Sequence, residues 1–162
     1  MVSIRYSMKT RNKVFEIIVV IISILIIAVL GSIFVNLGSE WFNLLIKPTQ
    51  WIPNIIIPIV WTIIYITFGI ILSLWIYNDY IPLDVVVLLI INGVLNILWC
   101  LLFFTLYLTF VGNIVIIFNL IASIILIVRI LHYKPLYAYL TIIYPLWLCL
   151  ATSLNLAIWI LN

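Results

Sequence analysis

The chain has 162 residues, of which 69% are apolar, and its few charges are seven Lys or Arg against four Asp or Glu. A soluble domain is about half apolar and about a quarter charged, so this chain cannot cover a water-facing surface. Composition excludes soluble enzymes and disordered chains, and the dispersed basic residues argue against a nucleic-acid partner. The class that remains is a polytopic membrane protein, which we treat as one domain over residues 1–162.

Charge-free windows in the sequence locate the membrane spans. They cover 17–39, 48–78, 85–128 and 135–162. A spanning helix needs about 20 apolar residues, so the third window holds two helices, with a turn near Gly112-Asn113. Backbone groups in lipid must be bonded internally, which makes the spans helical. The sequence therefore predicts an all-α bundle of five transmembrane helices at 14–35, 53–77, 84–105, 110–131 and 136–160.

The basic residues indicate how the bundle is oriented. Five spans place the two chain ends on opposite sides of the membrane. With the N-terminus inside, six basic residues are cytoplasmic and only Lys47 is outside, as the positive-inside rule favours. We therefore predict a cytoplasmic N-terminus in a bacterial cytoplasmic membrane. The six residues are Arg5, Lys9, Arg11, Lys13, Arg129 and Lys134.

The connection over residues 36–52 is too rich in aromatic residues and prolines to be a simple tether. Proline resists helix, so we expect a semi-rigid, non-helical cover. One interpretation is a segment that lies on lipid headgroups, and the other is a lid over a pocket mouth. The residues assigned to the lid are Trp41, Lys47, Pro48, Trp51 and Pro53.

Aromatic, amide and small residues recur at helical spacing on three of the predicted helices. An Asn in hydrocarbon is costly unless it faces another helix or a cavity. Each stripe taken alone is explained by packing between neighbouring helices. Three stripes together favour a shared interior pocket with aromatic walls, which suits a flat and largely apolar ligand. The stripes are Trp61, Tyr65 and Gly69; Asn92, Asn96 and Trp99; and Trp147, Ala151 and Asn155.

Catalytic and coupling chemistry has little support in this sequence. The single histidine, His132, falls in a loop, and no His/Cys cluster has metal-ligand spacing. All four carboxylates lie at helix ends or in loops, whereas ion-coupled carriers usually hold ionisable groups inside the membrane. The carboxylates are Glu16, Glu40, Asp79 and Asp84. The sequence predicts neither a metal site nor a catalytic set.

Four segments resemble the signature of the TspO/MBR family, the tryptophan-rich sensory proteins related to the translocator protein and peripheral benzodiazepine receptor. The segments, in chain order, are WFNLLIKPTQWIPN, PIVWTIIYITFG, LNILWCLLFF and YPLWLCLATSLN, and they cover residues 41 to 155. The resemblance implies a five-helix bundle, commonly a homodimer. It further implies binding of porphyrins, haem-like tetrapyrroles and synthetic benzodiazepine or isoquinoline ligands under the first loop, with no required cofactor.

Carried over position by position, the resemblance assigns a set of pocket residues that largely coincides with the three stripes. The ligand-binding residues are Phe42, Trp61, Tyr65, Asn96, Trp99, Trp147, Ala151 and Asn155. The lid is again the first loop.

The sequence departs from the family pattern at several positions. Trp51 comes one place late, Ile52 replaces the first of two prolines, and Pro145 comes two places late. Val115 stands where an Asp is common. No basic residue follows Asn155, so cholesterol is not the first choice of ligand.

Three functions remain open at this stage. The first is a membrane receptor or transporter for tetrapyrroles. The second is an enzyme that degrades bound porphyrin with light or oxygen, for which the porphyrin itself would supply most of the chemistry. The third is a regulatory membrane protein whose stripes serve only as an oligomer interface. The small-residue pair Ala28 and Ser32 on the first helix is one candidate contact for such an interface.

Overall fold

The structure is a computed structural model that describes residues 12–49 and 52–162. The described residues form helices and no strands, and five helical stretches are long and apolar enough to span a membrane. The expected all-α bundle of five spans is therefore confirmed. The elements are α1 (Lys13–Leu37), α2 (Ser39–Leu44), α3 (Ile56–Asn78), α4 (Leu83–Cys100), η1 (Leu101–Thr105), α5 (Thr109–Tyr133), α6 (Pro135–Thr141) and α7 (Ile143–Leu161).

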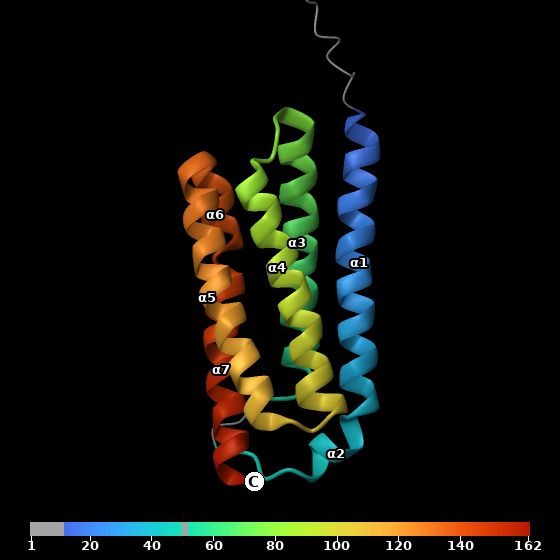
Figure 1. Cartoon of the computed structure of the whole chain (residues 1–162), viewed down its shortest axis with the longest axis vertical. Helices are drawn as coiled ribbons and strands as arrows, with labels where there is room; N and C mark the ends of the chain where they lie inside the picture. Colours follow the sequence, from blue (N-terminus) through green and yellow to red (C-terminus); the bar gives the residue numbers. More distant parts are fainter. Residues whose placement is uncertain (1–11, 50–51) are drawn as a thin grey trace, which may run out of the picture.

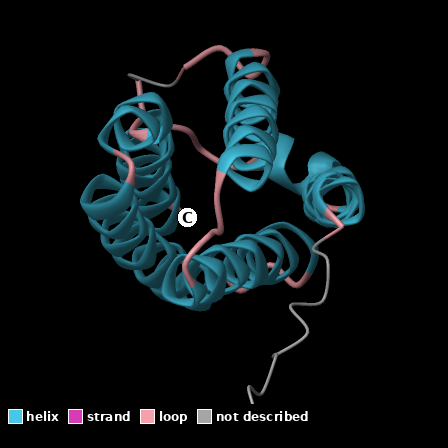
Figure 2. Cartoon of the chain, turned by 90° about the horizontal axis from the view of Figure 1, so that it is seen from above, coloured by secondary structure: helices cyan, strands magenta, loops and turns pink. Residues whose placement is uncertain are grey.

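The five spans stand side by side (Figure 1). Helix α1 packs against α3 on one side and α4 on the other, α4 packs against α5, and α5 packs against α6 and α7. Contacts of α3 with α6 and α7 complete the ring, which is seen end-on in Figure 2. The space inside the ring is therefore walled by all five spans.

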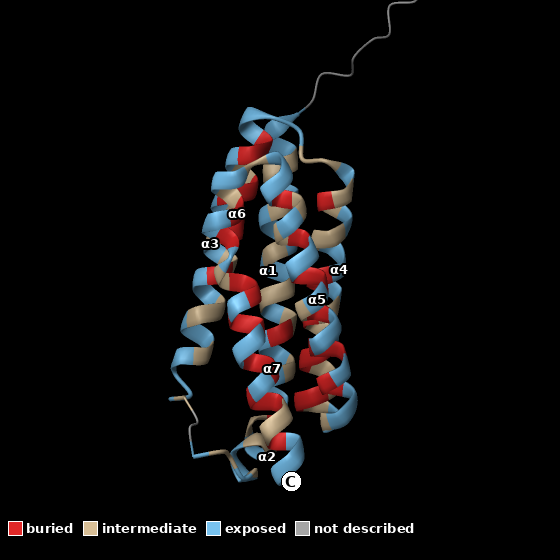
Figure 3. Cartoon of the chain, turned by 90° about the vertical axis from the view of Figure 1, so that its left-hand side faces the viewer, coloured by how far each residue is buried: buried red, intermediate tan, exposed pale blue. Residues whose placement is uncertain are grey.

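Burial divides each helix into an inner and an outer face (Figure 3). Large aliphatic and aromatic side chains such as Leu25, Ile90 and Phe118 are more than half exposed on the outside. Such a surface suits hydrocarbon, because lipid solvates apolar side chains while the helix satisfies its own backbone. Helix α1 is the least buried span, so its inner face is the most loosely covered part of the ring.

The expected single helix at 136–160 is wrong in one respect, because the structure divides it into α6 and α7 at Ile142. Pro145 explains the break. A proline nitrogen carries no hydrogen, so the carbonyl four residues earlier, that of Thr141, loses its helical partner. The fifth span is the short helix α6 followed by the 19-residue helix α7.

The expected non-helical connection at 36–52 is also corrected. Helix α1 continues to Leu37 and, after Gly38, residues 39–44 form the short helix α2. The prolines of this connection, Pro48 and Pro53, lie beyond α2 and so do not prevent it. Gly38 is required at the bend, because a Cβ there would lie 1.9 Å from the backbone oxygen of Phe104.

The third span agrees with its predicted range, 84–105, but its last turn is π-helical. A π-turn inserts an extra residue into the helix and rotates the side chains that follow it. In this turn Phe103 packs against Gly112 of α5, where a Cβ would lie 2.9 Å from the Phe103 Cβ. The neighbouring residue Phe104 contacts the ring of Phe42 in α2. The π-turn thus places both phenylalanines against Phe42, and Phe103 also against α5.

Ion pairs tie the loops together at the end of the bundle where α1 begins. Arg129 of α5 pairs with Asp84 at the start of α4, and Lys134 pairs with Asp79 at 3.0 Å. Lys13 donates a hydrogen bond to the backbone oxygen of Tyr77, at 2.7 Å. The described Lys and Arg side chains at this end therefore each bond to a neighbouring helix end or loop.

Candidate ligand-binding site

A cavity of about 560 Å³ lies between α1, α3 and α4 at the end of the bundle that α2 covers. We call it the lid cavity. Its wall includes five of the eight residues that the sequence assigned to the pocket, and these come from α2, α3 and α4. They are Phe42, Trp61, Tyr65, Asn96 and Trp99.

Aromatic rings form two walls of the lid cavity. Trp61 stacks on Tyr65 with 5.7 Å between ring centroids, and it lies 6.2 Å from Trp99 of α4. Phe42 and Phe104 meet at 5.2 Å on the side of α2. The i, i+4 spacing of Trp61 and Tyr65 places both rings on one helix face. These surfaces offer flat contact to a ring-shaped ligand.

Polar atoms at the inner end of the lid cavity are few and defined. Asn96 donates from Nδ2 to the Tyr65 hydroxyl at 3.0 Å. The Oδ1 of Asn96 and the indole Nε1 of Trp99 are buried and have no hydrogen-bond partner in the described residues. An unsatisfied buried polar group costs about 1–3 kcal/mol. A ligand that bonds to these atoms would recover that cost.

A second cavity of about 290 Å³, here called the inner cavity, lies on the other side of Trp61, Tyr65 and Asn96. These three residues line both cavities, so they form a partition between them. The inner cavity extends between α1, α3 and α4 toward Ile81 and Val86 at the opposite end of the bundle.

Helix α1 supplies a wall of the lid cavity that sequence reasoning missed. Its small residues Ala28, Gly31 and Ser32 line the cavity and leave room beside the aromatic residues of α3. The sequence showed Ala28 and Ser32 only as a possible helix-contact pair, because α1 is apolar on all sides. The sequence feature that indicates this wall is the cluster of small residues on α1, which the structure places across the cavity from Trp61.

The lid residues fulfil different roles. Phe42 lines the lid cavity, and the Lys47 ammonium lies 4.9 Å from its ring centroid. Trp41 instead contacts Phe103 and Tyr107, at 6.1 and 4.7 Å, and so anchors α2 to the end of the third span. Pro48 and Pro53 are not on the cavity wall. Trp51 lies outside the described residues.

A second anchor holds the connection after α2. The side chain of Asn162 accepts a hydrogen bond from the Ile46 nitrogen at 2.9 Å and donates one to the Ile46 oxygen at 3.0 Å. This pair fixes the chain one residue before Lys47. The ring contacts of Trp41 and the Asn162 hydrogen bonds to Ile46 thus attach the first half of the cover to the bundle at two points.

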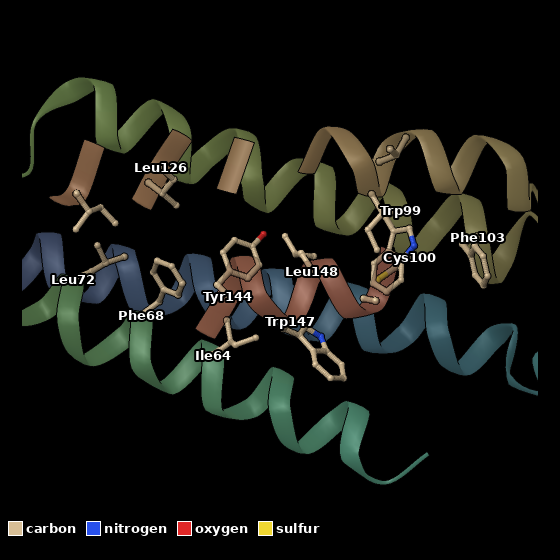
Figure 4. Close-up of a cluster of buried hydrophobic side chains, with 14 of the residues drawn as sticks. Ile64, Phe68, Leu72, Trp99, Cys100, Phe103, Leu126, Tyr144, Trp147 and Leu148 are labelled. Carbon is tan, nitrogen blue, oxygen red and sulfur yellow. The ribbon is translucent and has the colours of Figure 1, made fainter. Parts of the chain in front are cut away.

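The stripe predicted on the fifth span lies elsewhere. Trp147, Ala151 and Asn155 are buried in α7 but line neither cavity. Asn155 accepts a hydrogen bond from Asn113 of α5 at 3.4 Å through its backbone oxygen. Figure 4 shows Trp147 among the buried apolar side chains near Ile64. Tyr144 of α7 does line the inner cavity, and its ring centroid lies 6.3 Å from that of Trp61.

The fold and the site define a small polytopic membrane protein with an aromatic-walled cavity among its helices. A sequence model of the TspO/MBR family matches residues 12–160. The "Tryptophan-rich protein TspO" of Archaeoglobus fulgidus is 31% identical to the chain over 152 residues, which cover 93% of this chain and 99% of that protein. The chain therefore belongs to the TspO/MBR family.

Proposed function

We propose that this protein is a membrane receptor or carrier that binds porphyrins or related tetrapyrroles in the lid cavity. The observation that carries the proposal is a 560 Å³ cavity bounded by Phe42, Trp61 and Trp99 in a chain of this family. Its volume lies within the ~300–1,000 Å³ typical of ligand pockets. A flat macrocycle stacks favourably on such rings. Benzodiazepine and isoquinoline ligands carry planar aromatic rings that can stack in the same way.

The polar groups near the cavity match the periphery of a tetrapyrrole. Lys47 lies beside Phe42 at the cover, where its ammonium group suits the carboxylates that natural porphyrins carry on one edge. Asn96 Oδ1 and Trp99 Nε1, one acceptor and one donor, are buried in the wall deeper in the cavity. A ligand oriented with its carboxylates toward the cover uses both sets of contacts.

The orientation and assembly that accompany this function are also proposals. The described cations Lys13, Arg129 and Lys134 gather at one end of the bundle, which supports a cytoplasmic N-terminal end. The lid cavity then opens on the opposite side of a bacterial cytoplasmic membrane. We propose a homodimer on the basis of the family alone.

A second candidate function is light- or oxygen-dependent degradation of the bound tetrapyrrole. The observation that favours it is a chain of aromatic contacts, in which Trp61 meets Tyr65, Trp99 and Tyr144 within 6.3 Å. Indole and phenol side chains are oxidisable. Two results would support this candidate. The wild type should lose the porphyrin absorption band on illumination, and a Trp61→Phe variant should bind porphyrin as before without degrading it.

The test of binding is a titration of the purified protein with protoporphyrin IX, followed by tryptophan fluorescence. The expected result is saturable quenching that a Trp61→Ala/Asn96→Leu double variant loses, while a Trp159→Ala variant keeps it. Trp159 is exposed and contacts Phe110 away from the cavity. Equal quenching in the double variant, checked for unchanged helicity and oligomeric state, would overturn the proposal.

A further inference from the structure

The inner cavity has a built polar feature that the proposed function does not use. Asn92 of α4 lines this cavity and not the lid cavity, and it is only 4% exposed. Its Nδ2 donates to the Leu88 backbone oxygen at 2.8 Å. A carbonyl oxygen only accepts, so this bond fixes the orientation of the amide. The Oδ1 that remains has no partner in the described residues.

A second buried acceptor lies one helical turn away. Asn96 is also 4% exposed, lines the inner cavity, and has an unpartnered Oδ1. Its Nδ2 is engaged by the Tyr65 hydroxyl at 3.0 Å. Residues i and i+4 lie on the same helix face. The cavity wall therefore holds two buried carbonyl-type acceptors, each with almost no accessible surface, and an occupant that bonds to one must carry a hydrogen-bond donor and displace the side chains that cover it.

The rest of the inner cavity is apolar, with aliphatic side chains such as Ile24, Leu72 and Leu89. A water molecule would satisfy an amide oxygen but occupies only about 30 Å³ of liquid volume. The cavity volume of about 290 Å³ is roughly twice that of an apolar cavity of ~150 Å³ that holds benzene. The space therefore fits a molecule of about two fused rings.

The cavity reaches the outer surface of the bundle. Among its lining residues, Val19 and Ser23 of α1 and Ile90 of α4 are exposed. These side chains face the hydrocarbon of the membrane, so an apolar molecule dissolved in the bilayer can reach the cavity between α1 and α4. Water-soluble ions and sugars cannot use that route.

We propose that the inner cavity is a second binding site, for a small apolar alcohol that reaches it from the bilayer and donates its hydroxyl hydrogen to Asn92. This site adjoins the tetrapyrrole site across the shared residues Trp61, Tyr65 and Asn96, but Asn92 belongs to the inner cavity alone. It extends the account beyond the proposed function, and its failure would leave that proposal unchanged.

The test measures equilibrium binding of 2-naphthol to the protein in lipid nanodiscs, with empty nanodiscs subtracted. 2-Methoxynaphthalene has the same fused rings but no donor hydrogen. Loss of one hydrogen bond that leaves a buried acceptor unsatisfied changes affinity about tenfold. We expect saturable binding of 2-naphthol that is about tenfold tighter than that of the methyl ether.

Two variants locate the site. Asn92→Leu should weaken 2-naphthol about tenfold and leave the methyl ether unchanged or tighter. Val20→Phe, which fills the inner cavity from α1, should weaken both ligands. Asn78→Leu is the matched control, because Asn78 makes the same local bond, to the Leu74 oxygen at 2.8 Å, yet lines neither cavity.

The opposite results would overturn the proposal. Equal affinity for 2-naphthol and its methyl ether would remove the role of the amide acceptors. Unchanged 2-naphthol binding in both Asn92→Leu and Val20→Phe would place the ligand elsewhere. If Asn92→Leu fails to fold, the comparison of the two ligands in the wild type and the Val20→Phe result still decide the question.

Discussion

At the scale of single residues, the site is defined by aromatic rings whose spacing is visible in the sequence. Trp61, Tyr65 and Trp99 were predicted from four- and three-residue intervals, and the structure gathers them around one cavity. Trp147 was predicted by the same reasoning but packs in the apolar interior. Spacing identifies the inward face of a helix, whereas it does not say which neighbour that face meets. Side-chain packing decides which neighbour the inward face meets.

The first prediction concerns Trp99. Its ring forms a cavity wall beside Trp61, so Trp99→Ala should raise the dissociation constant of protoporphyrin IX by about tenfold to about a hundredfold. The measurement is the fluorescence titration, with Trp159→Ala as the tryptophan control. An unchanged constant for Trp99→Ala would mean that the ligand does not use this wall.

The second prediction concerns Lys47. If its ammonium group pairs with porphyrin carboxylates, Lys47→Gln should weaken protoporphyrin IX several-fold, by roughly 0.5–1 kcal/mol for a pair at the half-buried rim of the cavity. The dimethyl ester of the same porphyrin lacks the charges and should bind the variant and the wild type alike. Equal weakening of both ligands would point to a loss of cover structure instead of a lost ion pair.

At the scale of elements, the charge-free windows predicted the five spans because lipid tolerates few charges, but they did not predict the interruptions. The break at Ile142 and the π-turn at Leu101–Thr105 arise from Pro145 and from packing between Phe103 and Gly112. The prolines of the first connection argue against helix there, but they lie beyond residues 39–44 and leave α2 free to form. Local chain chemistry and tertiary contact fix these features, and hydropathy is insensitive to both.

The third prediction tests the attachment of α2 to the third span. An added Cβ at Gly38 would lie 1.9 Å from the Phe104 backbone oxygen, whereas at Gly69 the nearest side-chain atom would be 3.9 Å away. Gly38→Ala should therefore cost about 1–3 kcal/mol in the free energy of unfolding and weaken porphyrin binding. Gly69→Ala should be neutral or stabilising. The measurement is denaturation in detergent, and equal effects at both positions would contradict this contact.

The fourth prediction tests the second anchor of the cover. Asn162→Ala removes both hydrogen bonds to Ile46. With about 0.5–1.5 kcal/mol for each bond, the Ile46 amide should exchange its hydrogen about tenfold faster. Asn78→Ala serves as the control at the other end of the bundle. Unchanged exchange at Ile46 would show that the anchor does not hold the cover in solution.

At the scale of the whole molecule, composition and charge predicted a five-span membrane bundle, and the fold and family agree. The cavities themselves were beyond sequence reasoning, because their α1 walls are apolar or small and carry no distinguishing chemistry. The volume between helices depends on how loosely α1 packs against α3 and α4. The looseness of this packing is defined only once the helices have assembled into the ring.

The fifth prediction is the orientation of the bundle. The cationic end with Lys13, Arg129 and Lys134 should face the cytoplasm, and Lys47 should face the opposite side. A single cysteine introduced at Asn43 should react with a membrane-impermeant thiol reagent in intact cells, after Cys100→Ala and Cys149→Ala remove the two native thiols. A single cysteine at Asn78 should react only after lysis. The reverse pattern would invert the proposed orientation.

The most direct test of the central claim is a structure of the protein with haem bound, in which the anomalous signal of the iron locates the ring. We expect an iron peak inside the lid cavity, on the cavity side of the Trp61 and Trp99 rings and beneath α2. A peak on the lipid-facing surface or between two protomers, with the lid cavity empty, would contradict it.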